Sequence, residues 1–132
     1  SYPQWINKII LSIFLALEKS LDNIIREKIE KRFKRHLKIK KYVRKKIRSF
    51  GLKLFIEEDD YASSALTTFL LPKKIKLSHF VKKMDKDYNI VISGDLGYVD
   101  KHLVRIAHMG NSANISYVNK TLNAIHRIIN FK

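Results

Sequence analysis

The chain has 132 residues, no cysteine and a net charge of +15. Its length suits one domain with a modest core, and its 45% apolar and 30% charged residues argue against a disordered tail and a membrane protein. Without cysteine there is no disulfide framework and no cysteine-bearing metal site, so we expect a protein of the reducing cytoplasm.

Apolar residues recur every three or four positions across residues 6–48, which predicts one long helix or two in sequence. The polar stretch 20–23 favours helix caps and marks a candidate break, and Gly51 is the expected stop. The apolar run 9–17 is shorter than the about 20 residues that span a bilayer. In an isolated chain the apolar face of residues 6–25 would be exposed, which predicts aggregation or dimerisation through this helix unless another domain covers it.

Positive charge is concentrated between Arg26 and Arg48, where thirteen lysines and arginines stand against two glutamates. Such a patch is typical of nucleic-acid-binding proteins, and also of a long helix with one solvated face. No aromatic stacking platform or known binding motif accompanies the charge, so we favour the solvated face. A small basic protein that binds nucleic acid through helix 26–48 stays as the alternative function.

After Gly51 the apolar period changes to two, and strands alternate with helices. The whole pattern predicts an α+β fold: a long N-terminal helix (or two), then a small sheet of about four strands with helices packed on one face. Pro72 closes the second strand, residues 94–97 form a turn, and Asn114 or Ser116 caps the last helix. The predicted strands are 52–57, 64–71, 89–93 and 102–108, and the predicted later helices are 76–88 and 115–130.

Two groups of residues have side chains of the kind that bind metals, the acidic run 57–60 and the five histidines. The acidic run 57–60 has no neighbouring histidine and its adjacent carboxylates point in different directions, so a solvated loop is the better interpretation. The five histidines lack the spacing of a helical zinc site. We therefore expect no metal.

Arg105 lies between Val104 and Ile106 in a predicted strand, so its side chain faces the opposite side from theirs. A partly buried guanidinium needs an anionic partner, because an unpaired buried charge is costly. Its fork of donors fits a carboxylate bidentately. From spacing alone, a structural ion pair and a ligand-binding arginine are both open.

The stretches "NIVISGDLG" (89–97) and "LVRIAHMG" (103–110) resemble the C-terminal end of class V pyridoxal-phosphate-dependent aminotransferases, in particular the alanine–glyoxylate and serine–pyruvate group. Residues 31–55, with the Arg35-His36 pair, are similar to the long interdomain helix of that family. Residues 64–72 are similar to the first long strand of its small domain.

The resemblance implies three parts: residues 1–25 as the end of the large cofactor domain, 26–50 as the interdomain helix, and 51–132 as the C-terminal small domain. It also implies a site residue, since Arg105 matches the family arginine that binds the α-carboxylate of the substrate.

The same resemblance places His108, Met109 and Gly110 in the turn before the last helix. Asp95 and Ala107 stand where the family commonly has glycine, which puts the conformation of the 94–97 turn in question.

By the same resemblance, the family's Schiff-base lysine and phosphate cup lie upstream of the segment matched here, and no lysine of this chain has the small-residue setting of the family lysine. We therefore expect pyridoxal 5'-phosphate to be bound by a missing large domain, with no catalytic residue here and no activity for the chain alone. The implied partners are the remainder of the aminotransferase (in the same or a separate chain), amino acid and 2-oxo acid substrates, and a second copy in a homodimer. A fragment, a split-gene product and a decayed remnant are all open.

Overall fold

The computed structural model describes residues 3–94 and 102–130, and the chain divides into two compact units, residues 1–34 and 35–132. Two helices open the chain, α1 (Gln4–Glu27) and α2 (Ile29–Ser49). They are separated at Lys28, whose φ is 67°. The predicted break at 20–23 does not occur there: α1 continues through these residues, and the Ser20 hydroxyl donates to the Ala16 carbonyl (2.8 Å) within the helix.

The apolar residues of α1 are exposed on several sides of the helix. Ile13, Phe14 and Leu17 are 62%, 65% and 52% exposed, and the exposed set also contains Trp5, Ile9, Ile10, Leu11, Leu15, Leu21 and Ile25. The unit therefore presents a helix that buries little of its own apolar surface. No helix in the described part of the chain is long and apolar enough to cross a membrane.

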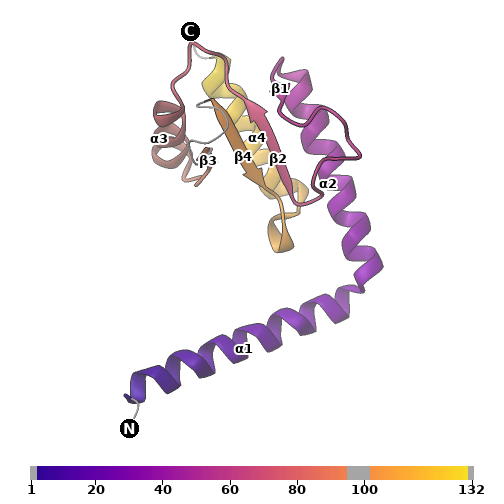
Figure 1. Cartoon of the computed structure of the whole chain (residues 1–132), viewed down its shortest axis with the longest axis vertical. Coiled ribbons are helices and arrows are strands. Elements are labelled where there is room, and N and C mark those ends of the chain that lie inside the picture. The colour runs from indigo at the N-terminus through magenta and orange to yellow at the C-terminus, as the bar shows by residue number, and fades with distance from the viewer. Residues whose placement is uncertain (1–2, 95–101, 131–132) are drawn as a thin grey trace. The chain divides into compact units, whose positions relative to one another are not determined.

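The second unit contains a four-stranded antiparallel sheet in the order β1-β2-β4-β3 (Figure 1). Its strands are β1 (Lys53–Leu54), β2 (Leu66–Leu70), β3 (Ser93–Gly94) and β4 (Leu103–Ala107). The later helices are α3 (Leu77–Tyr88) and α4 (Ile115–Asn130), with a 3-10 turn at Gly110–Ser112 before α4.

The hydrophobic core lies between the sheet and the helices. Thr67 and Phe69 of β2 and Val104 and Ile106 of β4 are buried, and α4 runs behind these two strands in Figure 1. Further core residues come from α2 and α4: Ile39, Val43, Ile47, Val118, Leu122 and Ile125. Of the alternate residues on the other face, Leu66, Thr68, Leu70 and Arg105 are half-buried, whereas Leu103 is buried. The predicted α+β class is confirmed.

The ends of two helices agree with the capping residues that the sequence predicted. The last helix matches its prediction, and the Asn114 side chain caps it by accepting a hydrogen bond from the Ser116 amide (2.8 Å). Gly51 follows α2 with φ 73°, a left-handed conformation that favours glycine.

The two edge strands are shorter than predicted. β1 ends at Leu54, because two carbonyls of the following segment accept hydrogen bonds from α2 and make no strand pairs. β3 begins only at Ser93, although Ile92 before it still packs in the core. Most of the predicted turn 94–97, with Asp95, lies outside the described residues.

Candidate functional site

Arg105 lies in the middle of β4 on the face of the sheet opposite the core. Thr68 of β2 and Ser93 of β3 are its partners in the strand register, so two hydroxyl-bearing residues flank it on that face. The Arg105 Nε donates to the Gly94 carbonyl (2.8 Å). This bond fixes one edge of the guanidinium, and no hydrogen bond joins its two terminal nitrogens to any other residue within 3–94 and 102–130, so they can take an anion.

No carboxylate within residues 3–94 and 102–130 forms an ion pair with Arg105. The guanidinium lines a small cavity of about 160 Å³ together with Ser93, Ala107 and Thr121. A half-buried guanidinium at a cavity is suited to bind a small anion, because it offers two parallel N–H donors in a partly desolvated place.

The turn between β4 and α4 is held by α2. Arg35 Nη1 donates to the carbonyls of Gly110 (2.9 Å) and Ala113 (2.7 Å), and the Gly110 amide donates to His36 Nε2 (3.2 Å). Gly110 has φ 57°, which places its N–H in line with the imidazole at little conformational cost. The Arg35-His36 pair and Gly110 were both singled out in the sequence, but not their contact.

His108 begins this turn and is fully buried. Its Nε2 lies 2.8 Å from the Thr67 hydroxyl, and its amide donates to the Ala65 carbonyl (2.8 Å). Burial lowers the pKa of His108 from the ordinary 6.5, and the nearby His36 lowers it further. His108 is therefore a neutral structural residue that ties β4 to β2, consistent with a role in shaping the turn.

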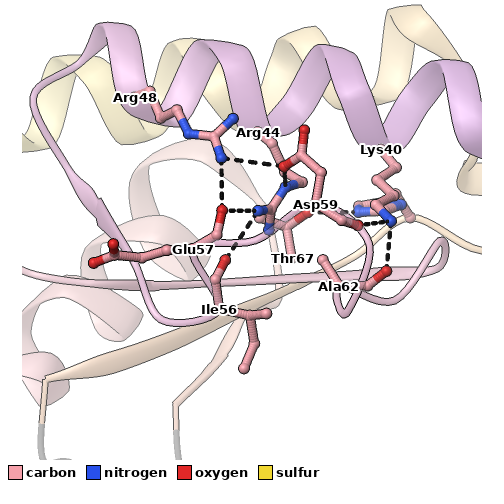
Figure 2. Close-up of polar contacts among 9 residues, drawn as sticks. Lys40, Arg44, Arg48, Ile56, Glu57, Asp59, Ala62 and Thr67 are labelled. Atoms are coloured by element: carbon pink, nitrogen blue, oxygen red, sulfur yellow. Dashed lines mark hydrogen bonds and ion pairs between the residues drawn. The ribbon is translucent and has the colours of Figure 1, made fainter.

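Basic residues of α2 bind the acidic loop that follows β1, as Figure 2 shows. Arg44, only 2% exposed, forms an ion pair with Asp59 and donates to the carbonyls of Ile56 and Glu57 (both 2.9 Å). Arg48 also reaches Asp59 (3.1 Å), and Lys40 donates to the backbone carbonyls of Asp59 and Ala62. We call Lys40, Arg44, Arg48 and Asp59 the helix–loop clamp.

The helix–loop clamp joins the acidic loop 57–60 to the basic face of α2. The Arg44 guanidinium, followed by Arg48, holds the pKa of the Asp59 carboxyl below its ordinary 3.8. Residues 57–60 are exposed, in agreement with the predicted solvated loop, and Asp59 in addition attaches this loop to α2. Part of the basic face of α2 is used inside the unit, since Lys40 and Arg44 are buried.

The clamp had a signal in the sequence. Lys40, Arg44 and Arg48 recur every four positions, and each comes directly after one of the buried residues Ile39, Val43 and Ile47. This places the three basic residues on one face of the helix beside the apolar stripe. Nothing in the spacing indicated that residues 56–62 would be their partner.

No family model matches the chain. An uncharacterized aminotransferase of Methanocaldococcus jannaschii is 33% identical over 100 residues, a match that covers 76% of this chain and 26% of the relative. A serine–glyoxylate aminotransferase of Arabidopsis thaliana is 28% identical over 101 residues, covering 76% of this chain and 25% of that protein.

Solved structures agree in fold. The alanine–glyoxylate aminotransferase of a Nostoc species matches with a TM-score of 0.82 at 24% identity, covering 86% of this chain and 30% of that one. The pyridoxamine–pyruvate aminotransferase of Mesorhizobium loti matches with a TM-score of 0.78 at 27% identity, covering 83% and 28%. The chain thus spans only about a quarter of the length of the curated relatives it matches.

Proposed function

Because the chain is a relative of the class V aminotransferases and corresponds to their C-terminal part, we propose that it is the C-terminal segment of a pyridoxal-phosphate-dependent aminotransferase in which Arg105 binds the α-carboxylate of the substrate. The proposed reaction exchanges an amino group between an amino acid and a 2-oxo acid, of the alanine or serine to glyoxylate or pyruvate type.

The observation that supports this proposal is the placement of Arg105. It lies on the half-buried face of the sheet, its Nε is bound to the Gly94 carbonyl, and no described carboxylate neutralises it. A carboxylate bound to the two terminal nitrogens would be held bidentately. Such a bond orients the amino acid, so that its amino group is presented in one direction.

The described residues around Arg105 do not fit the cofactor. No lysine lines the cavity of Arg105. A neighbouring cavity contains Lys120 but, among its lining residues, no acidic side chain that could pair with a pyridinium nitrogen. The cofactor and its lysine are therefore assigned to the remainder of the enzyme, and the chain alone should not transaminate.

The exposed apolar residues of α1 support the need for that remainder. A large-domain surface would remove them from water, at about 25 cal/mol for each Å² of apolar area buried. In this proposal residues 1–25 complete the large domain, 26–50 form the interdomain helix and 51–132 form the small domain. The complete enzyme would be a cytoplasmic homodimer, with the remainder in the same or a separate chain.

The first experiment is the intact mass of the product that carries this sequence, isolated from its own cells. A mass far above 15.5 kDa identifies a longer aminotransferase. A mass of 15.5 kDa identifies a separate chain, and the proposal then requires a copurifying partner that restores alanine-dependent transamination when mixed with it. Failure of every such mixture, with cofactor added, contradicts a split enzyme.

The role of Arg105 is tested in the complete enzyme with Arg105→Lys. We expect kcat/KM for the amino acid to fall about 100-fold, because a lysine cannot make the bidentate contact. The rate with a primary amine that lacks a carboxylate should change little. Arg127→Lys, at an exposed arginine of α4, is the matched control. Equal kcat/KM for Arg105→Lys and the control would contradict the assignment.

A further inference from the structure

A cavity of about 600 Å³ lies between the loop before α3, α3 itself and the last turn of α4. Lys74 and Lys76 line it from the loop, His79 and Lys83 from α3, and Ile128 and Ile129 from α4. None of these residues lines the cavity of Arg105. Its volume falls in the range of small-molecule sites, roughly 300–1,000 Å³.

The lining of this cavity carries positive charge from two elements. Its described lining contains three lysines and a histidine and no carboxylate. A smaller cavity of about 290 Å³ continues along α3 through Lys82 and Lys86, with Asp87 as its one acidic residue. Lys74 and Lys76 are two like charges at one cavity, and an anion bound between them would relieve their mutual repulsion.

These lysines differ from the buried lysine of α2. The Lys40 ammonium group donates hydrogen bonds to two backbone carbonyls of the loop after β1, those of Asp59 and Ala62. Lys74 and Lys76 are exposed, and neither forms an ion pair with any residue whose placement the structure gives. They are therefore available to a ligand without loss of an internal contact.

Isoleucine side chains also line the cavity. Ile128 and Ile129 belong to the hydrophobic core and show only 7% and 8% of their surface, and Ile75 is half-buried beside them. A site lined by both cations and aliphatic side chains is suited to a molecule with an anionic end and an apolar body.

We propose that this cavity binds a small phosphate monoester, with its phosphate among Lys74, Lys76 and His79 and its apolar body against Ile128 and Ile129. A phosphate, with nearly two negative charges and three acceptor oxygens, matches several cations better than a single carboxylate does. An extended nucleic acid fits less well, because the lining has no phenylalanine, tyrosine or tryptophan and only one histidine on which a base could stack.

The test uses the full chain and 4-nitrophenyl phosphate, measured by equilibrium dialysis and by ¹⁵N–¹H spectra at about 0.1 M salt, where diffuse attraction is screened. We expect saturable binding with one site and shifts of the α3 amides. The double variant Lys74→Gln/Lys76→Gln should weaken binding about tenfold or more, since two charge-assisted hydrogen bonds are lost.

The control double variant is Lys41→Gln/Lys45→Gln, which removes the same charge from exposed positions of α2 and should change affinity less than about twofold. Inorganic phosphate should bind about tenfold more weakly than the ester, because it cannot use the isoleucine wall.

Three outcomes would overturn the proposal. Equal loss of affinity in both double variants would indicate diffuse electrostatics. Equal affinity for inorganic phosphate would remove the apolar half of the site. Binding of a duplex oligonucleotide that depends on Lys74 and Lys76, with no binding of the ester, would make this surface a nucleic-acid site.

Discussion

Helices α1 and α4 have apolar residues at the same helical spacing, but the two helices differ in what covers them. Val118, Leu122 and Ile125 of α4 are at most 4% exposed, whereas Ile13, Phe14 and Leu17 of α1 are at least 52% exposed. Periodicity thus predicts that a face must be covered, and it does not say by what. For α4 the cover is in the same chain, and for α1 we propose that it is the remainder of the enzyme.

Truncating one leucine in each helix tests the difference in burial between α1 and α4 most directly. Leu122→Ala should lower the free energy of unfolding of the second unit by about 3 kcal/mol, because it leaves a cavity in the core. Leu17→Ala should lower it by less than about 0.5 kcal/mol. Denaturant unfolding followed by tyrosine near-UV signals measures the second unit, and fluorescence of Trp5, the only tryptophan, reports α1.

An equal loss for the two leucine variants would mean that α1 contributes to the same cooperative unit as α4. The proposed remainder would then be unnecessary for stability. A Trp5 spectrum that is already that of a buried indole in the isolated chain would point to self-association, which the dependence of sedimentation on concentration detects.

In the helix–loop clamp the same difference between buried and exposed positions applies to charged residues of α2. Arg44→Ala should destabilise the second unit by about 2–3 kcal/mol, because the Ile56 carbonyl loses its donor, while the Glu57 carbonyl and Asp59 keep only the exposed Arg48. Lys45→Ala, at the next and exposed residue, should cost less than about 0.5 kcal/mol. Matching midpoints in urea for the two variants would contradict a structural role of the clamp.

Gly94 gives a smaller effect with a local readout. A methyl group added there would come within 2.4 Å of Leu77 Cδ2, so Gly94→Ala should displace β3 from α3 and cost about 1–2 kcal/mol. Since the Gly94 carbonyl positions Arg105, the Nε–H resonance of Arg105 should shift as well. Gly51→Ala has open space at the Cβ and should leave that resonance unchanged. An unshifted Arg105 resonance in Gly94→Ala would remove Gly94 as its positioning group.

The smallest expected effect is on pH dependence. The pKa of His108 is lowered in the folded state by burial, so the unfolded state binds more protons below its ordinary 6.5. Stability should therefore be complete above pH 6.5 and decline as the pH falls toward the folded pKa. His108→Gln should flatten this decline in urea titrations, whereas His79→Gln, at an exposed histidine, should retain it. The Trp5 signal of α1 should not follow it in either variant.

What the sequence could predict depended on whether the relevant contact was local. The end of α2 at Gly51 and the cap of α4 follow from signals within a few residues. The end at Gly51 was predicted, and Asn114 is one of the two caps that were predicted. The alternation around Arg105 correctly separated its face from that of Val104 and Ile106, because strand geometry allows only two faces.

The features that were missed depend on residues far apart in the chain. Arg35 and His36 meet Gly110 across more than 70 positions, and Thr67 meets His108 across 41. The shortened β1 has the same origin, because the carbonyls that would extend it are taken by Arg44. Neither propensity nor spacing contains the fold that brings such pairs together.

The helix–loop clamp also decides where this molecule tolerates added sequence. Polar surface loops are the usual places for insertions and for proteolytic nicking, and residues 56–62 resemble one in composition. Here the loop backbone is bound to α2 at Ile56, Glu57, Asp59 and Ala62. A tag or fusion partner placed between them would separate the helix from its acceptors, and a glutamate-specific protease should cut this loop only after the unit unfolds.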